Sequence, residues 1–318
     1  MTWTTYRWDD VDAPTLSASS SSNLVALLEA VLVTGYSSGG TAKAAAGWSI
    51  SNNTSSSAVF QNAGTGKSVK VTHAASTSYA RVVGSEANDG IGPFFPTEVQ
   101  MPGGGYIYLS STTDGTARPW LIQADSKRFY MWIGAGATTA QGITTNSIYG
   151  QLFFFGDITP DRGDDAFHFM VVHGIGSTNS SSQGASMTNA AGSSINGHYL
   201  CRDISQTGGS KPCGKIGDNS IAQVAVIGTG GVPYPDPAGG GMRMTPVRVA
   251  ESNSVIRGAM PGLWCPLHNI AAAASNPAPG DTFTGTGALA GKTFLLLNSY
   301  GNGGGTGRIA LEISDTVA

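Results

Sequence analysis

The sequence predicts a mainly β protein, built as a sandwich or irregular barrel with one N-terminal α-helix and long Gly/Ser-rich loops. Glycine is the first reason, because the 318 residues include 45 glycines, about twice the usual share of roughly 7%. They gather in clusters such as 103–105, 239–241 and 303–305. The second reason is that short β-branched or aromatic runs lie between these clusters, a pattern typical of strands joined by frequent turns.

The predicted helix covers residues 23–33. Residues three and four apart share one face of a helix, and here that face carries Leu24, Leu27, Leu28, Val31 and Leu32. Ser22 is the expected N-cap, and Gly35 is the expected residue just past the C-terminus. A second, short Ala-rich helix is a candidate at 270–275.

The clearest strand signal is a hairpin, with aromatic strands at 119–123 and 128–133 around the polar turn 124–127. Residues 308–313 alternate apolar and polar side chains, which predicts one buried and one solvated face. Further strands are expected at 67–72, 79–83, 106–109, 151–155, 166–172, 221–227, 246–249 and 293–297.

Composition changes divide the chain into four segments. Residues 1–48 form an N-terminal arm and helix, and residues 49–173 a β domain. Residues 174–215 are dominated by Ser, Gly, Thr and Asn, which predicts a long loop or projection of the kind that is functional or ordered by a partner. Residues 216–318 continue the β structure or form a second β subdomain.

Charge and hydropathy argue against two classes of partner. Charged residues make up 12% of the chain, with a net charge of −3, so no basic footprint for nucleic acid is present. No stretch reaches the 18 apolar residues of a membrane span, and the N-terminus lacks the cationic and apolar regions of a Sec signal. We expect no nucleic-acid partner and no membrane partner.

Two short motifs resemble catalytic or nucleotide-binding sequences and fail on context. Residues 64–68 look like the end of a P-loop, but Gln61 stands where another Gly is needed, and a strand pattern follows instead of a helix. Residues 35–39 fit G-x-S-x-G, yet a predicted helix precedes them, whereas a nucleophile elbow lies between a strand and a helix.

Metal and redox sites are likewise not predicted. Four acidic residues are close enough in sequence to supply Ca²⁺ ligands, namely Asp157, Asp161, Asp164 and Asp165. Their spacing matches no EF-hand loop, so a solvated turn is the better interpretation. His168 and His173 would point to opposite faces of one strand. Of the three cysteines, Cys201 and Cys213 are able to pair across a loop, although reduced thiols are favoured. We predict no catalytic residue, no cofactor and no metal.

The N-terminal aromatic residues are the candidate interface. Trp3, Tyr6 and Trp8 lie in a polar segment without a core of its own, and Trp and Tyr are enriched in protein interfaces. Two placements remain open. The segment is either an arm that docks on another subunit or a segment that folds back onto the core of its own chain.

Several segments together resemble a family of virion structural proteins of tailed bacteriophages. The N-terminal one is W-D-D-x-x-A-P-x-L at residues 8–16, just before the helix. The others are the helix and its exit at 24–36, A-G-W at 46–48, G-P-F-F-P-T at 92–97, A-R-P-W at 117–120, R-F-Y at 128–130, F-F-G-D at 154–157 and R-G-x-x-P-G-L-W-x-P-L-H at 257–268. The resemblance implies a virion component assembled in the cytoplasm of a bacterial host.

We therefore expect a non-enzymatic structural component of the tail, neck or baseplate that acts by protein–protein assembly with other virion proteins and as a homo-oligomer. A capsid decoration protein is one alternative. A receptor- or glycan-binding module of the same particle is another, with residues 174–215 as its possible binding loop. An enzyme such as a depolymerase or lysin would need paired carboxylates or a Ser/His/Asp constellation, and no segment points to either.

Overall fold

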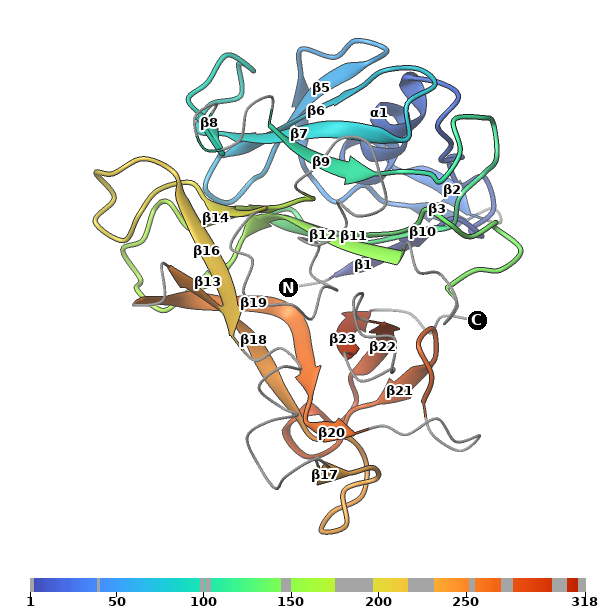
Figure 1. The fold of residues 1–318 in the computed structure, drawn as a ribbon, viewed down its shortest axis with the longest axis vertical. Coiled ribbons are helices and arrows are strands. Elements are labelled where there is room, and N and C mark those ends of the chain that lie inside the picture. Colours follow the sequence, from blue (N-terminus) through green and yellow to red (C-terminus); the bar gives the residue numbers. More distant parts are fainter. Residues whose placement is uncertain are drawn as a thin grey trace.

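The computed structural model describes residues 3–38, 41–97, 100, 104–143, 150–174, 197–216, 232–251, 255–269, 277–298 and 308–313. These residues form three stacked layers (Figure 1). A small antiparallel sheet with helix α1 makes one outer layer, the first half of a large sheet makes the middle layer, and the second half of that sheet makes the other outer layer. The predicted mainly β architecture with an N-terminal helix is confirmed.

The small sheet follows the strand order β4-β5-β6-β7-β8, with β9 also paired to β7. All of these pairings are antiparallel. Its strands are β4 (Ser49–Ser51), β5 (Ser57–Gln61), β6 (Ser68–His73), β7 (Tyr79–Ser85), β8 (Phe94–Phe95) and β9 (Gly105–Tyr108). The strands predicted at 67–72, 79–83 and 106–109 are β6, β7 and β9.

The middle layer is the first half of the large sheet, in the order β1-β10-β11-β12-β14-β15-β16. Its strands are β1 (Thr4–Arg7), β10 (Trp120–Ala124), β11 (Arg128–Gly134), β12 (Gly150–Asp157), β14 (Phe169–Val172), β15 (His198–Leu200) and β16 (Lys211–Ile216). The predicted hairpin is confirmed as β10 and β11, paired from Trp120↔Ile133 to Ala124↔Phe129.

The second half of the large sheet continues in the order β18-β19-β23-β22-β21, with short β13 paired to β19. Its strands are β18 (Met244–Glu251), β19 (Val255–Pro266), β23 (Arg308–Ile313), β22 (Thr293–Asn298), β21 (Thr282–Thr284) and β13 (Thr159–Pro160). One sheet therefore runs across the segment boundaries expected at 173 and 215. Two strand pairs stand apart: β2 (Tyr36–Ser38) with β3 (Thr41–Lys43), and β17 (Val232–Pro233) with β20 (His268–Asn269).

The side chains of the middle-layer strands point alternately to the two faces of the sheet, and each face contributes to a separate hydrophobic core. In β11, Phe129 and Met131 face the small sheet and helix, whereas Tyr130 and Trp132 face the C-terminal half of the large sheet. Successive side chains of a strand point to opposite faces. Since both faces are covered, every residue of β11 is buried, and the strand appears in the sequence as a continuous aromatic run.

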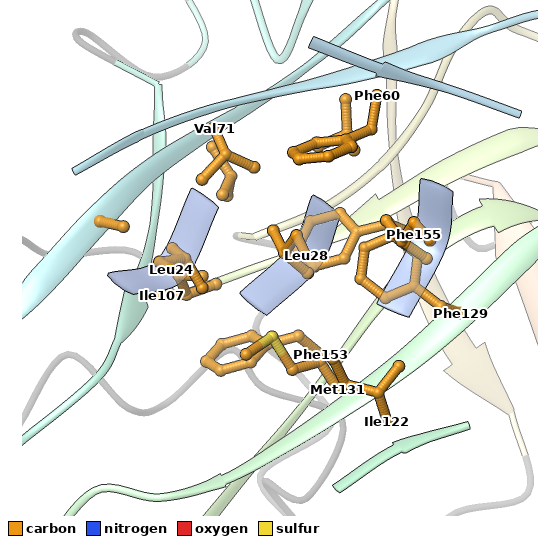
Figure 2. Packing of buried hydrophobic residues seen from close by; sticks show 14 of the residues in the cluster. Leu24, Leu28, Phe60, Val71, Ile107, Ile122, Phe129, Met131, Phe153 and Phe155 are labelled. Carbon is orange, nitrogen blue, oxygen red and sulfur yellow. The ribbon is translucent and has the colours of Figure 1, made fainter. Parts of the chain in front are cut away.

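Helix α1 (Ser22–Glu29) fills the space between the small sheet and the middle layer. Figure 2 shows Leu24 and Leu28 between Phe60 of β5 and the side chains of Met131 and Phe153. Full burial of such a side chain stabilises the fold by roughly 1.5–3 kcal/mol. The predicted apolar helix face is thus confirmed as the packed face.

The ends of the helix differ from the prediction in detail. Ser22 is the first helical residue rather than the N-cap, which is Ser21, and no side-chain hydrogen bond caps the helix. After Glu29 the α-helix widens to a π-helical turn, Ala30–Thr34. Gly35 ends that turn with φ +75°, and a Cβ there would lie 2.5 Å from the Lys43 carbonyl oxygen. Only glycine fits this exit without a shift.

Residues 197–216 contradict part of the loop predicted over 174–215. They contain β15 and β16, which join the large sheet through β14 and β18. Tyr199, Leu200 and Cys213 are buried there. The surrounding Ser/Gly-rich composition conceals these strands, because their burial comes from distant neighbours. Residues 175–196, the strand expected at 221–227 and the helix expected at 270–275 lie outside the described residues.

Within the described ranges, no helix has the length and apolar character needed to cross a bilayer. A 3₁₀ turn, Gly287–Leu289, precedes β22.

Candidate interaction surfaces

The N-terminal aromatic segment folds back as an edge strand of the large sheet. Strand β1 pairs with β10, with Tyr6 opposite Ile122. Tyr6 is completely buried, and its hydroxyl donates a 2.6 Å hydrogen bond to the Ala44 carbonyl. Burial raises the pKa of Tyr6 to about 12. This is the second of the two placements left open by the sequence, and it leaves Tyr6 no surface for another molecule.

Trp3 and Trp8 each keep part of their surface exposed. The Trp3 ring stacks on Tyr130 with ring centroids 5.9 Å apart, on the face opposite Tyr6. Trp8 packs at the edge of the helix-side core, with the Arg7 guanidinium 5.4 Å from its ring centroid. The interface role stays a prediction for these two residues.

A tight turn follows β1 and is anchored by Asp10. One carboxylate oxygen of Asp10 accepts hydrogen bonds from the Arg7 backbone N–H at 2.9 Å and from the Tyr36 hydroxyl at 2.5 Å. Lys43 Nζ lies 3.0 Å from the same oxygen. Burial, together with the neighbouring Asp10 carboxylate, holds the pKa of Tyr36 far above its usual range. Three separate segments thus fix one side chain.

We call residues 8–12 the N-terminal turn. Its tip presents Val11, whose surface is 55% exposed, between the exposed Asp9 and Asp12. Asp12 has φ +62°, a conformation that Asp tolerates better than most residues. The turn is therefore anchored by Asp10 and exposes an aliphatic side chain and part of an indole ring beside the carboxylates of Asp9 and Asp12.

A second surface lies on the outer face of the small sheet. Thr72 of β6 is opposite Arg81 of β7, and Lys70 is opposite Val83. These four side chains share one face, whereas Val69, Val71, Ala80 and Val82 point into the core. A hollow of about 290 Å³ opens there. We call it the cationic groove; its lining residues are Lys70, Thr72, Arg81, Val82, Val83, Phe94, Pro96 and Gly104.

The two cations of the groove are held by ring contacts. Lys70 Nζ donates a 3.0 Å hydrogen bond to the Gly90 carbonyl and lies 5.6 Å from the centroid of the Phe94 ring. The Arg81 guanidinium lies 5.7 Å from the centroid of Tyr106, which is opposite it on β9. Such cation–π contacts orient a cation without neutralising it.

A rigid loop forms one wall of the groove. The Asp89 carboxylate accepts hydrogen bonds from the backbone N–H of Ile91 at 2.8 Å and of Gly92 at 3.4 Å. Side chains of Ser51 and Asn52 donate to carbonyls of the same loop. At its far end Phe95 is buried against Gly84, where a Cβ would lie 2.3 Å from the ring. The wall therefore has a fixed position.

The P-loop-like motif has a structural role here. Thr65 donates from its backbone N–H and its hydroxyl to the Asp157 carboxylate, at 3.0 and 2.7 Å. This contact ties the turn between β5 and β6 to the end of β12. Ser37 of the G-x-S-x-G segment lies within strand β2, not between a strand and a helix, so it is not on a nucleophile elbow.

Each carboxylate of the acidic stretch has a partner within the chain. Asp157 binds Thr65; ion pairs join Asp161 to Arg248 at 2.9 Å, Asp164 to Arg162 at 2.6 Å and Asp165 to Arg257 at 2.7 Å. Among the described residues, no group of three or more His, Cys, Asp and Glu side chains is arranged to hold a metal ion.

The histidines and cysteines of the sequence analysis lie apart from one another, and His168 is partly exposed. His173 follows β14 and stacks on Tyr199 with ring centroids 5.8 Å apart, whereas His168 lies in the turn before β14. Cys201, Cys213 and Cys265 are free and buried. Burial raises the pKa of Cys201 to about 12, which disfavours the reactive thiolate form.

The sequence motifs did not indicate the cationic groove, because its side chains come from β6, β7 and the 86–96 loop and meet only through strand register.

Comparison with known proteins assigns no function to either surface. The sequence matches no protein-family model and has no significant match among curated proteins.

Proposed function

We propose that the protein is a non-enzymatic structural component of a tailed-phage virion, in the tail, neck or baseplate, and that it acts by assembling with other virion proteins and with copies of itself. The observation that carries the proposal is the N-terminal turn. The W-D-D segment, on which the phage resemblance begins, is the same segment that Asp10 anchors, and it leaves Val11 exposed.

The physical argument is preorganisation. A segment that is already rigid loses little conformational entropy when it docks, so more of the contact energy appears as affinity. Trp side chains are frequent anchors of protein interfaces, and Trp8 keeps part of its ring exposed beside Val11. The low share of charged residues, 12%, also limits the desolvation penalty when large surfaces are buried.

A particle-incorporation experiment tests the proposal. Val11→Asp places a charge at the tip of the turn and leaves the core untouched. We expect the variant to fold with an unchanged melting temperature and to enter purified particles at least tenfold less than the wild type in a complementation assay. Ile256→Asp is the matched control, because Ile256 is 48% exposed on the distant strand β19. Equal incorporation of both variants would overturn the role of the turn.

A capsid decoration protein would use the N-terminal turn to bind a capsid protein instead of a tail protein. Finding the protein in the head fraction or in the tail fraction of purified particles therefore distinguishes these two roles. The receptor- or glycan-binding alternative draws on the cationic groove instead.

A further inference from the structure

We propose that the cationic groove is a binding site for an acidic saccharide, a sugar unit that carries a carboxylate. The site lies on β6, β7 and the 86–96 loop, whereas the N-terminal turn contacts β2, β3 and β10. The inference therefore goes beyond the proposed assembly function and does not depend on it.

Uncompensated positive charge is the first argument. In the described part of the chain, ion pairs join most cations to carboxylates, including Arg7, Lys43, Arg128, Arg162, Arg202, Arg243, Arg248, Arg257 and Lys292. Lys70 and Arg81 have no such partner among those residues, yet they are diagonal neighbours on one sheet face, close enough for both to reach one ligand. Among the residues that the structure describes, no Asp or Glu lines the groove.

The donor set is the second argument. Lys and Arg side chains donate hydrogen bonds and never accept them, and among the side chains of the described lining residues only the Thr72 hydroxyl is able to do both. Such a lining suits a ligand rich in acceptors. A carboxylate pairs with the planar guanidinium of Arg81 through two parallel hydrogen bonds, while Lys70 adds a second charge.

The apolar wall is the third argument. The partly exposed Phe94 ring provides surface for the C–H face of a pyranose ring, and Val83 and the buried Pro96 also line the hollow. A side chain cannot occupy the place of Gly104, because a Cβ there would lie 2.4 Å from the nearest Val83 methyl carbon. The hollow therefore stays open at this point, with two cations and apolar side chains together in its lining.

Size favours a saccharide over an acidic peptide. The volume of about 290 Å³ lies at the small end of ligand pockets, which are roughly 300–1,000 Å³, and suits one or two sugar units. The groove also lies over the face of the sheet. An extended peptide instead binds along an exposed strand edge, where backbone hydrogen bonds are available.

Calorimetry on the purified full chain tests the site. The probes are tri-galacturonic acid and trimeric sialic acid, with an uncharged galactose trisaccharide and a tri-glutamate peptide for comparison. We expect at least one acidic trisaccharide to bind at least tenfold more tightly than the neutral one, and its affinity to fall as salt rises. Arg81→Gln and Lys70→Gln should each weaken that binding by tenfold or more.

Controls separate this proposal from the assembly function. Lys127→Gln removes a partly exposed cation from the β10–β11 turn and should leave saccharide binding unchanged. Val11→Asp should also bind normally, and the groove variants should enter particles normally. The proposal is overturned if neither acidic trisaccharide binds, if the neutral sugar binds equally well, or if both groove variants bind like the wild type. Tighter binding of tri-glutamate would replace the saccharide with an acidic protein segment.

Discussion

Arg257 of β19 and Asp165 of the loop before β14 form an ion pair in which both side chains are almost completely buried, with Nη2 2.7 Å from Oδ2. The second nitrogen of the guanidinium, Nη1, lies 2.7 Å from the Glu251 carboxylate and also donates to the Arg202 carbonyl. One cation thus joins the middle layer to the C-terminal half of the large sheet.

Arg257→Ala should destabilise the protein strongly. It leaves two carboxylates buried without their cation, and breaking a buried pair in this way costs about 3–5 kcal/mol. The measurement is the denaturation midpoint in guanidinium chloride. Arg248→Ala is the control, because Arg248 and Asp161 form an ion pair that is about half exposed and worth about 0–1 kcal/mol. Similar midpoints for the two variants would show that the buried cluster does not hold the layers together.

Gly258→Ala should weaken the same junction by overpacking. A Cβ at Gly258 would lie 2.1 Å from the Thr159 carbonyl oxygen, across the β13–β19 pairing. Backbone cannot move aside cheaply, so we expect a loss of about 1–3 kcal/mol in the free energy of unfolding. Gly163→Ala, in the neighbouring loop, meets nothing within 4 Å and should be neutral. A melting temperature unchanged in both variants contradicts this packing.

Asp10 and Asp9 are adjacent in sequence, yet replacing each with alanine should change the free energy of unfolding by different amounts. Asp10→Ala removes the acceptor shared by Arg7 N–H and Tyr36 and the charge beside Lys43, and should cost about 1–3 kcal/mol. Asp9 is paired to Arg7 but is 42% exposed, so Asp9→Ala should cost less than about 1 kcal/mol. Thermal melts of the two variants check the order. If Asp9→Ala were the more damaging, Asp10 would not be the anchor of the turn.

His173 should make the protein sensitive to acid. Burial lowers the pKa of His173 to about 4, whereas the unfolded chain takes up the proton near the ordinary value of about 6.5. The native state therefore binds fewer protons between these values, and the stability contributed by the neutral ring, about 3 kcal/mol, is lost as the pH falls from about 6.5 to about 4.

His173→Phe tests this titration, because it keeps a ring against Tyr199 and removes the titrating group. The slope of unfolding free energy against pH should flatten between pH 4 and 6.5, whatever the change in absolute stability. His168→Gln serves as the control, since His168 is in a partly exposed turn. An unchanged slope in His173→Phe would mean that this residue does not carry the acid sensitivity.

The sequence predicted correctly those elements whose defining residues are close together in the chain. The β10–β11 hairpin has its turn residues and aromatic strands adjacent in sequence, and the helix is marked by five apolar residues on one face. β15 and β16 were missed because their burial depends on β14 and β18, strands distant in sequence.

The candidate surfaces were also only partly predictable, because they too depend on contacts between residues distant in sequence. Trp3 and Trp8 were identified from composition, but the anchoring of the turn by Asp10 requires Tyr36 and Lys43. The cationic groove requires the β6–β7 register to bring Lys70 beside Arg81, and a loop closed through Asn52 to place its wall. Neither arrangement is encoded in a short motif.

Quantitative mass spectrometry of purified phage particles, with heads and tails separated beforehand, is the most direct measurement of the assembly proposal. We expect to recover this chain in one fraction at a fixed stoichiometry to the other proteins of that fraction, and with the tails if it belongs to the tail or baseplate. Its absence from both fractions would contradict a structural role in the virion.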